Sequence, residues 1–94
     1  LRNNPPPIIQ EEVFINPEYK NERLDACLGF AHDCTGERAA TRWCRDVQHF
    51  KGGVADFDLD IEVGKRGIKT KTIDDERVCN AEYCSAFKRI ICKQ

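Results

Sequence analysis

The six cysteines carry the clearest chemistry in the sequence. Only Cys79 and Cys84 are spaced closely enough to suggest half of a tetrahedral zinc site, and no second pair or nearby histidine completes one. We therefore expect three disulfide bonds and no metal. Disulfides are typical of proteins that work in an oxidising compartment.

Enzymatic activity would require an activated nucleophile or a pair of positioned acids. The sequence contains His32, His49 and a single serine, Ser85, and its cysteines are expected to be oxidised. No pair of carboxylates stands apart from ordinary surface acids. We predict a protein that is not an enzyme and that has no cofactor.

Three aspartates, Asp56, Asp58 and Asp60, superficially resemble a calcium-binding series. Calcium loops turn tightly around a glycine, whereas these residues alternate as in an extended strand, about 6.6 Å apart on one face. Surface electrostatics is the favoured interpretation, although Asp56 and Asp58 lack an evident lysine partner.

A row of arginines is a candidate anion site. Arg38, Arg42 and Arg45 recur at helical spacing and could hold a sulfated sugar, a phosphate or a carboxylate. Such a row is more often a solvated helix face.

Two loops are candidates for contact with a partner. Lys65 and Arg66 fall in an expected turn, and a rigid turn of this kind could act as a protease-inhibitor loop. A second loop, closed by a bond between Cys79 and Cys84, would present Tyr83 as a contact aromatic.

One helix is expected over residues 35–50. Thr35 can cap it, Glu37 lies in the first turn where the helix dipole favours an anion, and Gly52-Gly53 ends it. Apolar residues recur along it at helical spacing: Ala39, Ala40, Trp43, Cys44 and Val47.

The strongest pattern is the strict alternation of apolar and acidic residues over 55–63, which is typical of a half-buried strand. Residues 64–67 form a turn, and residues 68–72 alternate on the return. We expect the helix to cover the apolar face of this hairpin, which is formed by Phe57, Leu59 and Ile61.

The hairpin also has an expected register. With Lys65 and Arg66 as the loop residues, Glu62 lies opposite Lys69 and Asp60 lies opposite Lys71. These opposite charges face each other on the solvent side, and a slip of one residue would lose both pairs.

Two further strands complete the predicted fold, one at 12–15, ended by Asn16-Pro17, and one at 86–92. We predict a single α+β domain over residues 11–94, in which one helix packs on a small antiparallel sheet stapled by three disulfides. Residues 1–10 form a Pro-rich lead-in that favours a polyproline conformation.

Six cysteines allow fifteen pairings. Cys34 precedes the helix and Cys44 lies well inside it, roughly 12 Å or more away, which disfavours a bond between these two. The preferred set is 27–34, 44–92 and 79–84, and the set 27–44, 34–92 and 79–84 stays open.

Size and charge exclude several classes of protein. Lys and Arg total 15, Asp and Glu total 16, and the net charge is −1, which argues against a nucleic-acid binder or a cationic membrane-lytic peptide. No run of about 20 apolar residues could span a membrane. The start without methionine fits a secreted protein after removal of a signal peptide.

Several short stretches form a recognisable series: residues 23–28, Cys34, Ala39-Ala40, Trp43-Cys44-Arg45, residues 78–84 and residues 87–92. The series resembles a group of small secreted, cysteine-rich plant proteins. Because such proteins are often defence-related, the resemblance implies defence, including antimicrobial action, or extracellular recognition.

We therefore expect a secreted, non-enzymatic binding protein whose partner is a protein or a cell-wall carbohydrate. A protease inhibitor acting through Lys65-Arg66 or the loop between Cys79 and Cys84 is one alternative. An extracellular signalling ligand is another. The oligomeric state stays open.

Overall fold

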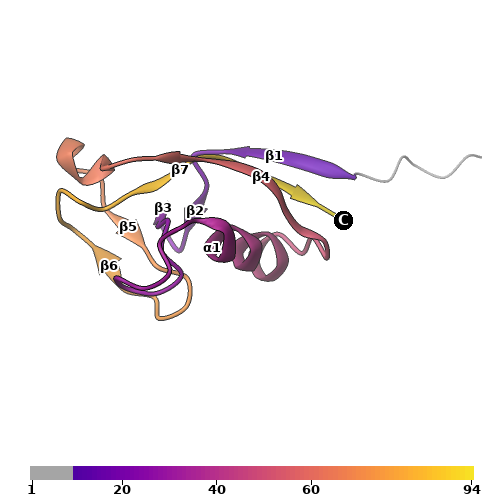
Figure 1. Ribbon diagram of the computed structural model, residues 1–94, viewed down its shortest axis with the longest axis horizontal. Helices are drawn as coiled ribbons and strands as arrows, with labels where there is room; N and C mark the ends of the chain where they lie inside the picture. Colours follow the sequence, from indigo (N-terminus) through magenta and orange to yellow (C-terminus); the bar gives the residue numbers. More distant parts are fainter. Residues whose placement is uncertain (1–9) are drawn as a thin grey trace, which may run out of the picture.

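The computed structural model describes residues 10–94, which form two small sheets and one helix (Figure 1). The first sheet is antiparallel and has the order β1 (Glu11–Ile15), β7 (Ala86–Lys93), β4 (Gly53–Asp60). The second has the order β2 (Glu18–Tyr19), β3 (Glu22–Leu24), β5 (Thr70–Lys71), β6 (Val78–Cys79), with β3 and β5 parallel. The α+β prediction is confirmed, whereas the polyproline prediction lies outside the described residues.

The helix begins two residues later than the predicted range of 35–50 and ends earlier. α1 (Glu37–Arg42) continues into a π-helical turn, η1 (Trp43–Val47), so that helical structure stops before Phe50. The predicted Thr35 cap is wrong, because Gly36 occupies the N-cap position and no side chain caps the helix. The Thr35 hydroxyl donates instead to Asp33 Oδ1 over 3.1 Å.

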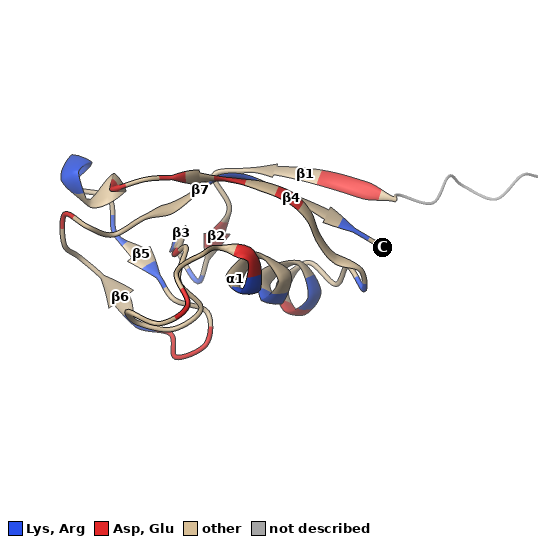
Figure 2. Cartoon of the chain, viewed as in Figure 1, with Lys and Arg blue, Asp and Glu red and all other residues tan. Residues whose placement is uncertain are grey.

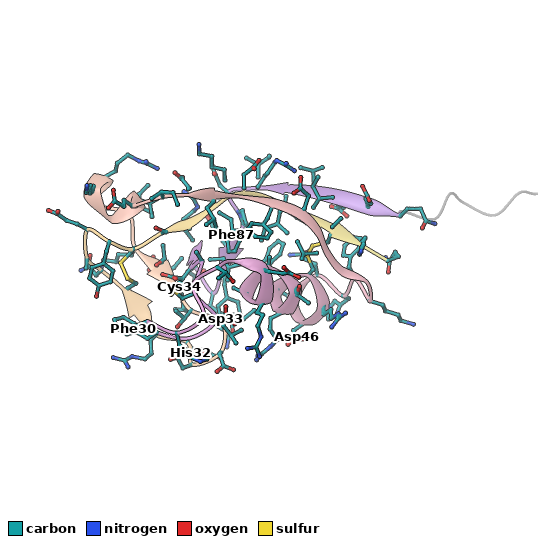
Figure 3. The ribbon with its side chains drawn as sticks, in the orientation of Figure 1. Phe30, His32, Asp33, Cys34, Asp46 and Phe87 are labelled. Carbon is teal, nitrogen blue, oxygen red and sulfur yellow. A yellow bond between two sulfur atoms is a disulfide. The ribbon has the colours of Figure 1, made fainter. Side chains whose placement is uncertain are left out.

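The core lies between one face of the first sheet and the elements packed on it, which include α1, η1 and β3. Phe87 of β7 lies in this layer (Figure 3). The rings of Phe57 and Phe87 pack edge to face with their centroids 5.6 Å apart, and the rings of Phe14 and Trp43 pack in the same way with their centroids 5.0 Å apart. The buried cluster consists of Leu24, Leu28, Ala39, Ala40, Trp43, Cys44, Phe50, Ile73, Phe87, Ile90 and Cys92.

The apolar face predicted for residues 55–63 is only partly buried. Phe57 and Leu59 pack against the core, but Ile61 is 59% exposed, so its predicted place under the helix is wrong. Two register shifts in β4, between Val54 and Asp56 and between Asp58 and Leu59, interrupt the simple alternation. The strand then ends at Asp60, before Ile61 is reached.

The expected hairpin does not form. Glu62 adopts a left-handed conformation with φ of 55°, and the next residues wind into a short 3-10 helix, η2 (Val63–Arg66). The returning residues leave the first sheet and join β3 as β5. β4 pairs instead with β7, an eight-residue strand that the Cys44–Cys92 bond joins to η1, and only two of the returning residues form a strand.

The predicted pairs Glu62–Lys69 and Asp60–Lys71 are therefore wrong, although residues of opposite charge do face each other across the first sheet. Arg89 of β7 contacts Asp56, with Nη2–Oδ2 at 2.7 Å, and Asp58, with Nε–Oδ2 at 2.5 Å. Glu62 forms an ion pair with Lys65 and Asp60 with Arg23 and Arg66, in place of the expected Lys69 and Lys71.

The preferred disulfide set is confirmed, and the alternative set is wrong. The structure contains Cys27–Cys34, Cys44–Cys92 and Cys79–Cys84, and leaves no cysteine free. In residues 10–94, no helix is both long and apolar enough to cross a membrane.

Candidate functional site

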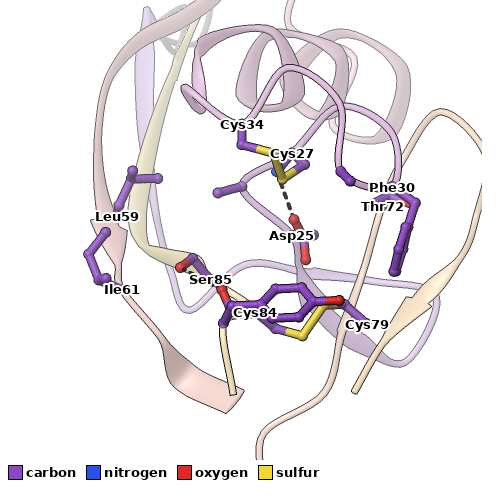
Figure 4. Close-up of a pocket in the computed structure, with 13 residues that line it drawn as sticks. Asp25, Cys27, Phe30, Cys34, Leu59, Ile61, Thr72, Cys79, Cys84 and Ser85 are labelled. Atoms are coloured by element: carbon purple, nitrogen blue, oxygen red, sulfur yellow. Dashed lines mark hydrogen bonds between the residues drawn. A yellow bond between two sulfur atoms is a disulfide. The ribbon is translucent and has the colours of Figure 1, made fainter. Parts of the chain in front are cut away.

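A cavity of about 220 Å³ lies between the two short disulfide loops (Figure 4). Phe30 belongs to the loop closed by Cys27–Cys34, and Tyr83 belongs to the loop closed by Cys79–Cys84. Both disulfides themselves line the cavity. Two walls of the cavity are thus short loops, each closed by a disulfide between cysteines seven or five residues apart.

The remaining side of the cavity comes from the end of β4. Leu59 and Ile61 lie across the cavity from Phe30 (Figure 4). Ala26, Ala31, Thr72 and Ser85 complete most of the lining, which is mainly apolar. A volume below the range of about 300–1,000 Å³ typical of drug-sized pockets suits one side chain or a small fragment.

The floor segment, from Asp25 to Cys27, is held by the backbone of both sheets. The Asp25 amide donates to the Lys71 carbonyl over 2.9 Å, and the Ala26 amide donates to the Ser85 carbonyl over 2.9 Å. Asp25 also forms an isolated bridge with Ala86. The floor is therefore fixed in place before any ligand arrives.

Asp25 is the one acid in the cavity lining, and it is 2% exposed. Its Oδ1 accepts from the Cys27 amide over 2.8 Å, and its Oδ2 accepts from the Thr70 hydroxyl. Burial raises the pKa of Asp25, the two hydrogen bonds only partly offset this, and nearby Asp75 raises it further. Among residues 10–94, no lysine or arginine forms an ion pair with this carboxyl.

Asp75 does not line the cavity but forms hydrogen bonds with two residues that do. Its Oδ1 accepts from the Thr72 hydroxyl and its Oδ2 accepts from the Phe30 amide over 3.0 Å. These hydrogen bonds lower the pKa of Asp75, and Arg77 adds to the effect. The Arg77 guanidinium lies 4.4 Å from the centre of the Phe30 ring. Asp25 thus lines the cavity itself, whereas Asp75 and Arg77 contact residues of its lining.

The predicted arginine row is on the helix, but each member already has an acceptor. Arg38 Nη1 lies 3.1 Å from Asp33 Oδ2, and Arg45 Nε donates to the Lys51 carbonyl over 3.2 Å. Arg42 lies between Asp46 and Asp74, which raise its pKa. Figure 2 shows acidic and basic residues mixed along this helix. The anion site stays a prediction, and these acceptors weigh against it.

Lys65 and Arg66 lie on η2, the basic segment at the far end of the first sheet in Figure 2. Lys65 Nζ lies 3.0 Å from Glu62 Oε1, and Arg66 Nη2 lies 3.1 Å from Asp60 Oδ2. The pair is thus wound into a helical turn and ion-paired. Of the six predicted binding residues, only Tyr83 lines the cavity.

Asp60 accepts hydrogen bonds from two arginines. Arg23 Nη2 and Arg66 Nη2 each lie 3.1 Å from Asp60 Oδ2, and the side chains of Arg23 and Asp60 are only 13% and 12% exposed. Burial alone would raise the pKa of Asp60, but the two guanidinium groups outweigh it, so the pKa is lowered.

We expect Asp60→Asn to lower the free energy of unfolding at pH 7 by about 2 kcal/mol, since it removes hydrogen bonds to a charged acceptor. An unfolded aspartate titrates near pH 3.9 and the folded pKa is lower, so this stabilisation is complete above about pH 5. It is lost as the pH falls through the folded pKa, where variant and wild type converge.

Urea unfolding at several pH values measures the effect of Asp60→Asn. Asp58→Asn is the matched control, because the Asp58 side chain is 55% exposed and its loss should change stability much less. Equal effects of the two variants at pH 7, or a difference that persists in strong acid, would contradict this account.

The other candidate groups lie apart from the cavity. His32 and His49 are both exposed, and neither lines it. Over residues 10–94, no three His, Cys, Asp or Glu side chains gather closely enough to hold a metal ion.

Sequence reasoning missed Asp25, the central polar group of the cavity. Its only signal was a single acid in the otherwise apolar run Leu24-Asp25-Ala26-Cys27-Leu28. An acid so placed is either turned to solvent or buried with partners, and its donor Thr70 is 45 residues away.

Comparison with known proteins adds no assignment to this geometry. No family model, curated protein or solved structure matches the chain.

Proposed function

We propose that this protein is a secreted, non-enzymatic binding protein that holds an apolar group of its ligand in the cavity between its two short disulfide loops. The observation that carries the proposal is that Cys27–Cys34 and Cys79–Cys84 line one and the same cavity. Walls closed by short covalent loops lose little conformational entropy when a ligand enters. Three disulfides support an oxidising, extracellular setting.

The exposed aromatic residue at the cavity favours a protein or a carbohydrate as the partner. Tyr83 is 65% exposed while it lines the cavity, so its ring is free to stack on a sugar ring or a peptide. Exposed aromatics beside a rigid hollow are typical anchor points of binding surfaces. Defence or extracellular recognition is the biological setting we propose for such binding.

The alternatives receive less support from the geometry. A protease-inhibitor loop would have to present Lys65 or Arg66 to the protease, yet both belong to η2 and are paired with acids. The loop between Cys79 and Cys84 is a better candidate for presentation because Tyr83 projects from it. A signalling role has no specific feature in its favour.

Titration of the isotope-labelled protein with benzyl alcohol, a small neutral aromatic probe, tests the proposal. We expect backbone amide shifts confined to residues around the cavity. Ile61→Ala should weaken binding by roughly three- to tenfold, because Ile61 supplies apolar surface to the cavity.

Ile15→Ala is the matched control for Ile61→Ala. Ile15 is 67% exposed and lies on β1, whereas Ile61 is 59% exposed at the cavity. Binding should be unchanged in this control. Shifts scattered over the surface, or equal losses in both variants, would overturn the proposal.

A further inference from the structure

We propose that the cavity selects a primary ammonium group carried on an apolar stem, with the Asp25 carboxylate as its counter-ion. This inference deepens the proposed function and rests on it. The juxtaposition that carries it is a buried acid at the floor of a mainly apolar cavity, with no cationic partner in the part of the chain that the structure describes.

The first step concerns the charge of Asp25. A carboxylate buried among apolar groups is costly unless a cation pairs with it. Within residues 10–94, two hydrogen-bond donors reach it, the Thr70 hydroxyl and the Cys27 amide. Each carboxylate oxygen can accept a second hydrogen bond. A ligand ammonium entering from the cavity would supply the missing cation and additional donors.

The second step concerns the surroundings of the carboxylate. Asp75 adds a second negative charge near Asp25, and Arg77, which lies over the Phe30 ring, is a positive charge that acts on Asp75. When all three are ionised, Asp25, Asp75 and Arg77 together carry one net negative charge. This favours a monovalent cation over an anion or a neutral group.

The third step concerns the body of the ligand. Leu59, Ile61 and the two disulfides offer apolar contact, and the Tyr83 ring adds an aromatic face that attracts cations. A short alkyl or benzyl stem matches this lining. The same chemistry is found in a free small amine and in a lysine side chain of a partner protein.

Figure 4 shows how these groups are placed relative to one another. Asp25 lies between the Cys27–Cys34 bond on one side and the Cys79–Cys84 bond on the other, with Phe30 opposite Leu59 and Ile61. The carboxyl is therefore central to the lining and not at its margin.

The test compares benzylamine with benzyl alcohol, its neutral counterpart, by amide-shift titration of the full chain at pH 7. We expect benzylamine to bind at least about tenfold more tightly at the cavity, because it alone can pair with Asp25. In Asp25→Asn the two probes should bind equally. Asparagine keeps the bond from the Cys27 amide, which its oxygen accepts, and replaces the bond from the Thr70 hydroxyl by one of opposite direction, in which the asparagine amide donates to the Thr70 oxygen.

A second arm works on the wild-type protein and does not depend on the variant folding. When the pH is lowered until Asp25 is protonated, the preference for benzylamine should disappear while benzyl alcohol binding remains. Equal binding of both probes at pH 7 overturns the inference and leaves the proposed function intact. If neither probe binds at the cavity, both the inference and the proposed function are overturned.

A third arm separates the two sources of the ammonium group. A short peptide with blocked termini and one lysine is titrated in the same way. Binding at the cavity identifies a protein lysine as the ligand group. Binding of benzylamine without binding of the peptide identifies a free small amine.

Discussion

Replacing Cys44 and Cys92 together by alanine is expected to lower the free energy of unfolding by about 4 kcal/mol, the largest loss for any single disulfide in this chain. The two cysteines are 48 residues apart in sequence, and a longer closed loop restricts the unfolded chain more. Both side chains are also fully buried in the core. A small domain with little core to spare should then be only marginally folded.

The measurement is urea unfolding of the double variant under non-reducing conditions. Cys79→Ala with Cys84→Ala is the matched control, because these cysteines are only five residues apart. Its expected loss is about 2 kcal/mol on the same loop-closure model. An equal or larger loss in the control would show that loop length does not govern the contribution of these bonds.

The disulfides differ in sequence separation, and we infer that they also differ in role. Cys44–Cys92 joins η1 to the central strand β7 and so fixes the helix over the first sheet. Cys27–Cys34 and Cys79–Cys84 close short loops at the cavity. The long-range bond therefore maintains the fold, and the two local bonds shape the candidate site.

Local patterns in the sequence predicted most of the elements. Helical spacing located Trp43 and Cys44 on the buried face of one helix, and the distance between positions 34 and 44 along the chain disfavoured a bond between Cys34 and Cys44. Strands at both ends of the domain were also predicted, and β1 and β7 are found there. Such features depend on neighbours within a few residues.

Strand pairing could not be predicted in the same way. The alternation around β4 specifies a strand with one apolar face, but it does not specify which strand lies beside it. A turn sequence favoured residues 68–72, whereas β7, which lies beyond them in the sequence, supplies longer pairing and Arg89 as partner for Asp56 and Asp58. The choice depends on the whole domain.

The candidate site was hidden for the same reason. The cavity combines the segment after β3, the end of β4, and the loop between β6 and β7. Tyr83 was predicted because the cysteines on either side of its loop mark it locally. Asp25 was not, because its burial and its partner Thr70 come from distant parts of the sequence.

Gly64→Ala is expected to disrupt both the fold and the cavity. A Cβ atom on Gly64 would lie 1.7 Å from the Ala81 carbonyl oxygen, so the backbone of the loop closed by Cys79–Cys84 would have to move away. The Gly64 amide also donates to the Cys84 carbonyl over 3.2 Å. We expect a loss of stability of about 3 kcal/mol, at the upper end for overpacking.

Gly67→Ala separates this steric effect from backbone strain. Nothing lies within 4 Å of the Cβ position at Gly67, and its φ of 78° is the only obstacle to alanine. That strain costs about 1 kcal/mol. Because the displaced loop is one wall of the cavity, Gly64→Ala should also abolish the benzyl alcohol shifts around it, whereas Gly67→Ala should leave them unchanged. If Gly64→Ala unfolds no more readily than Gly67→Ala, the contact between η2 and that loop does not hold the wall in place.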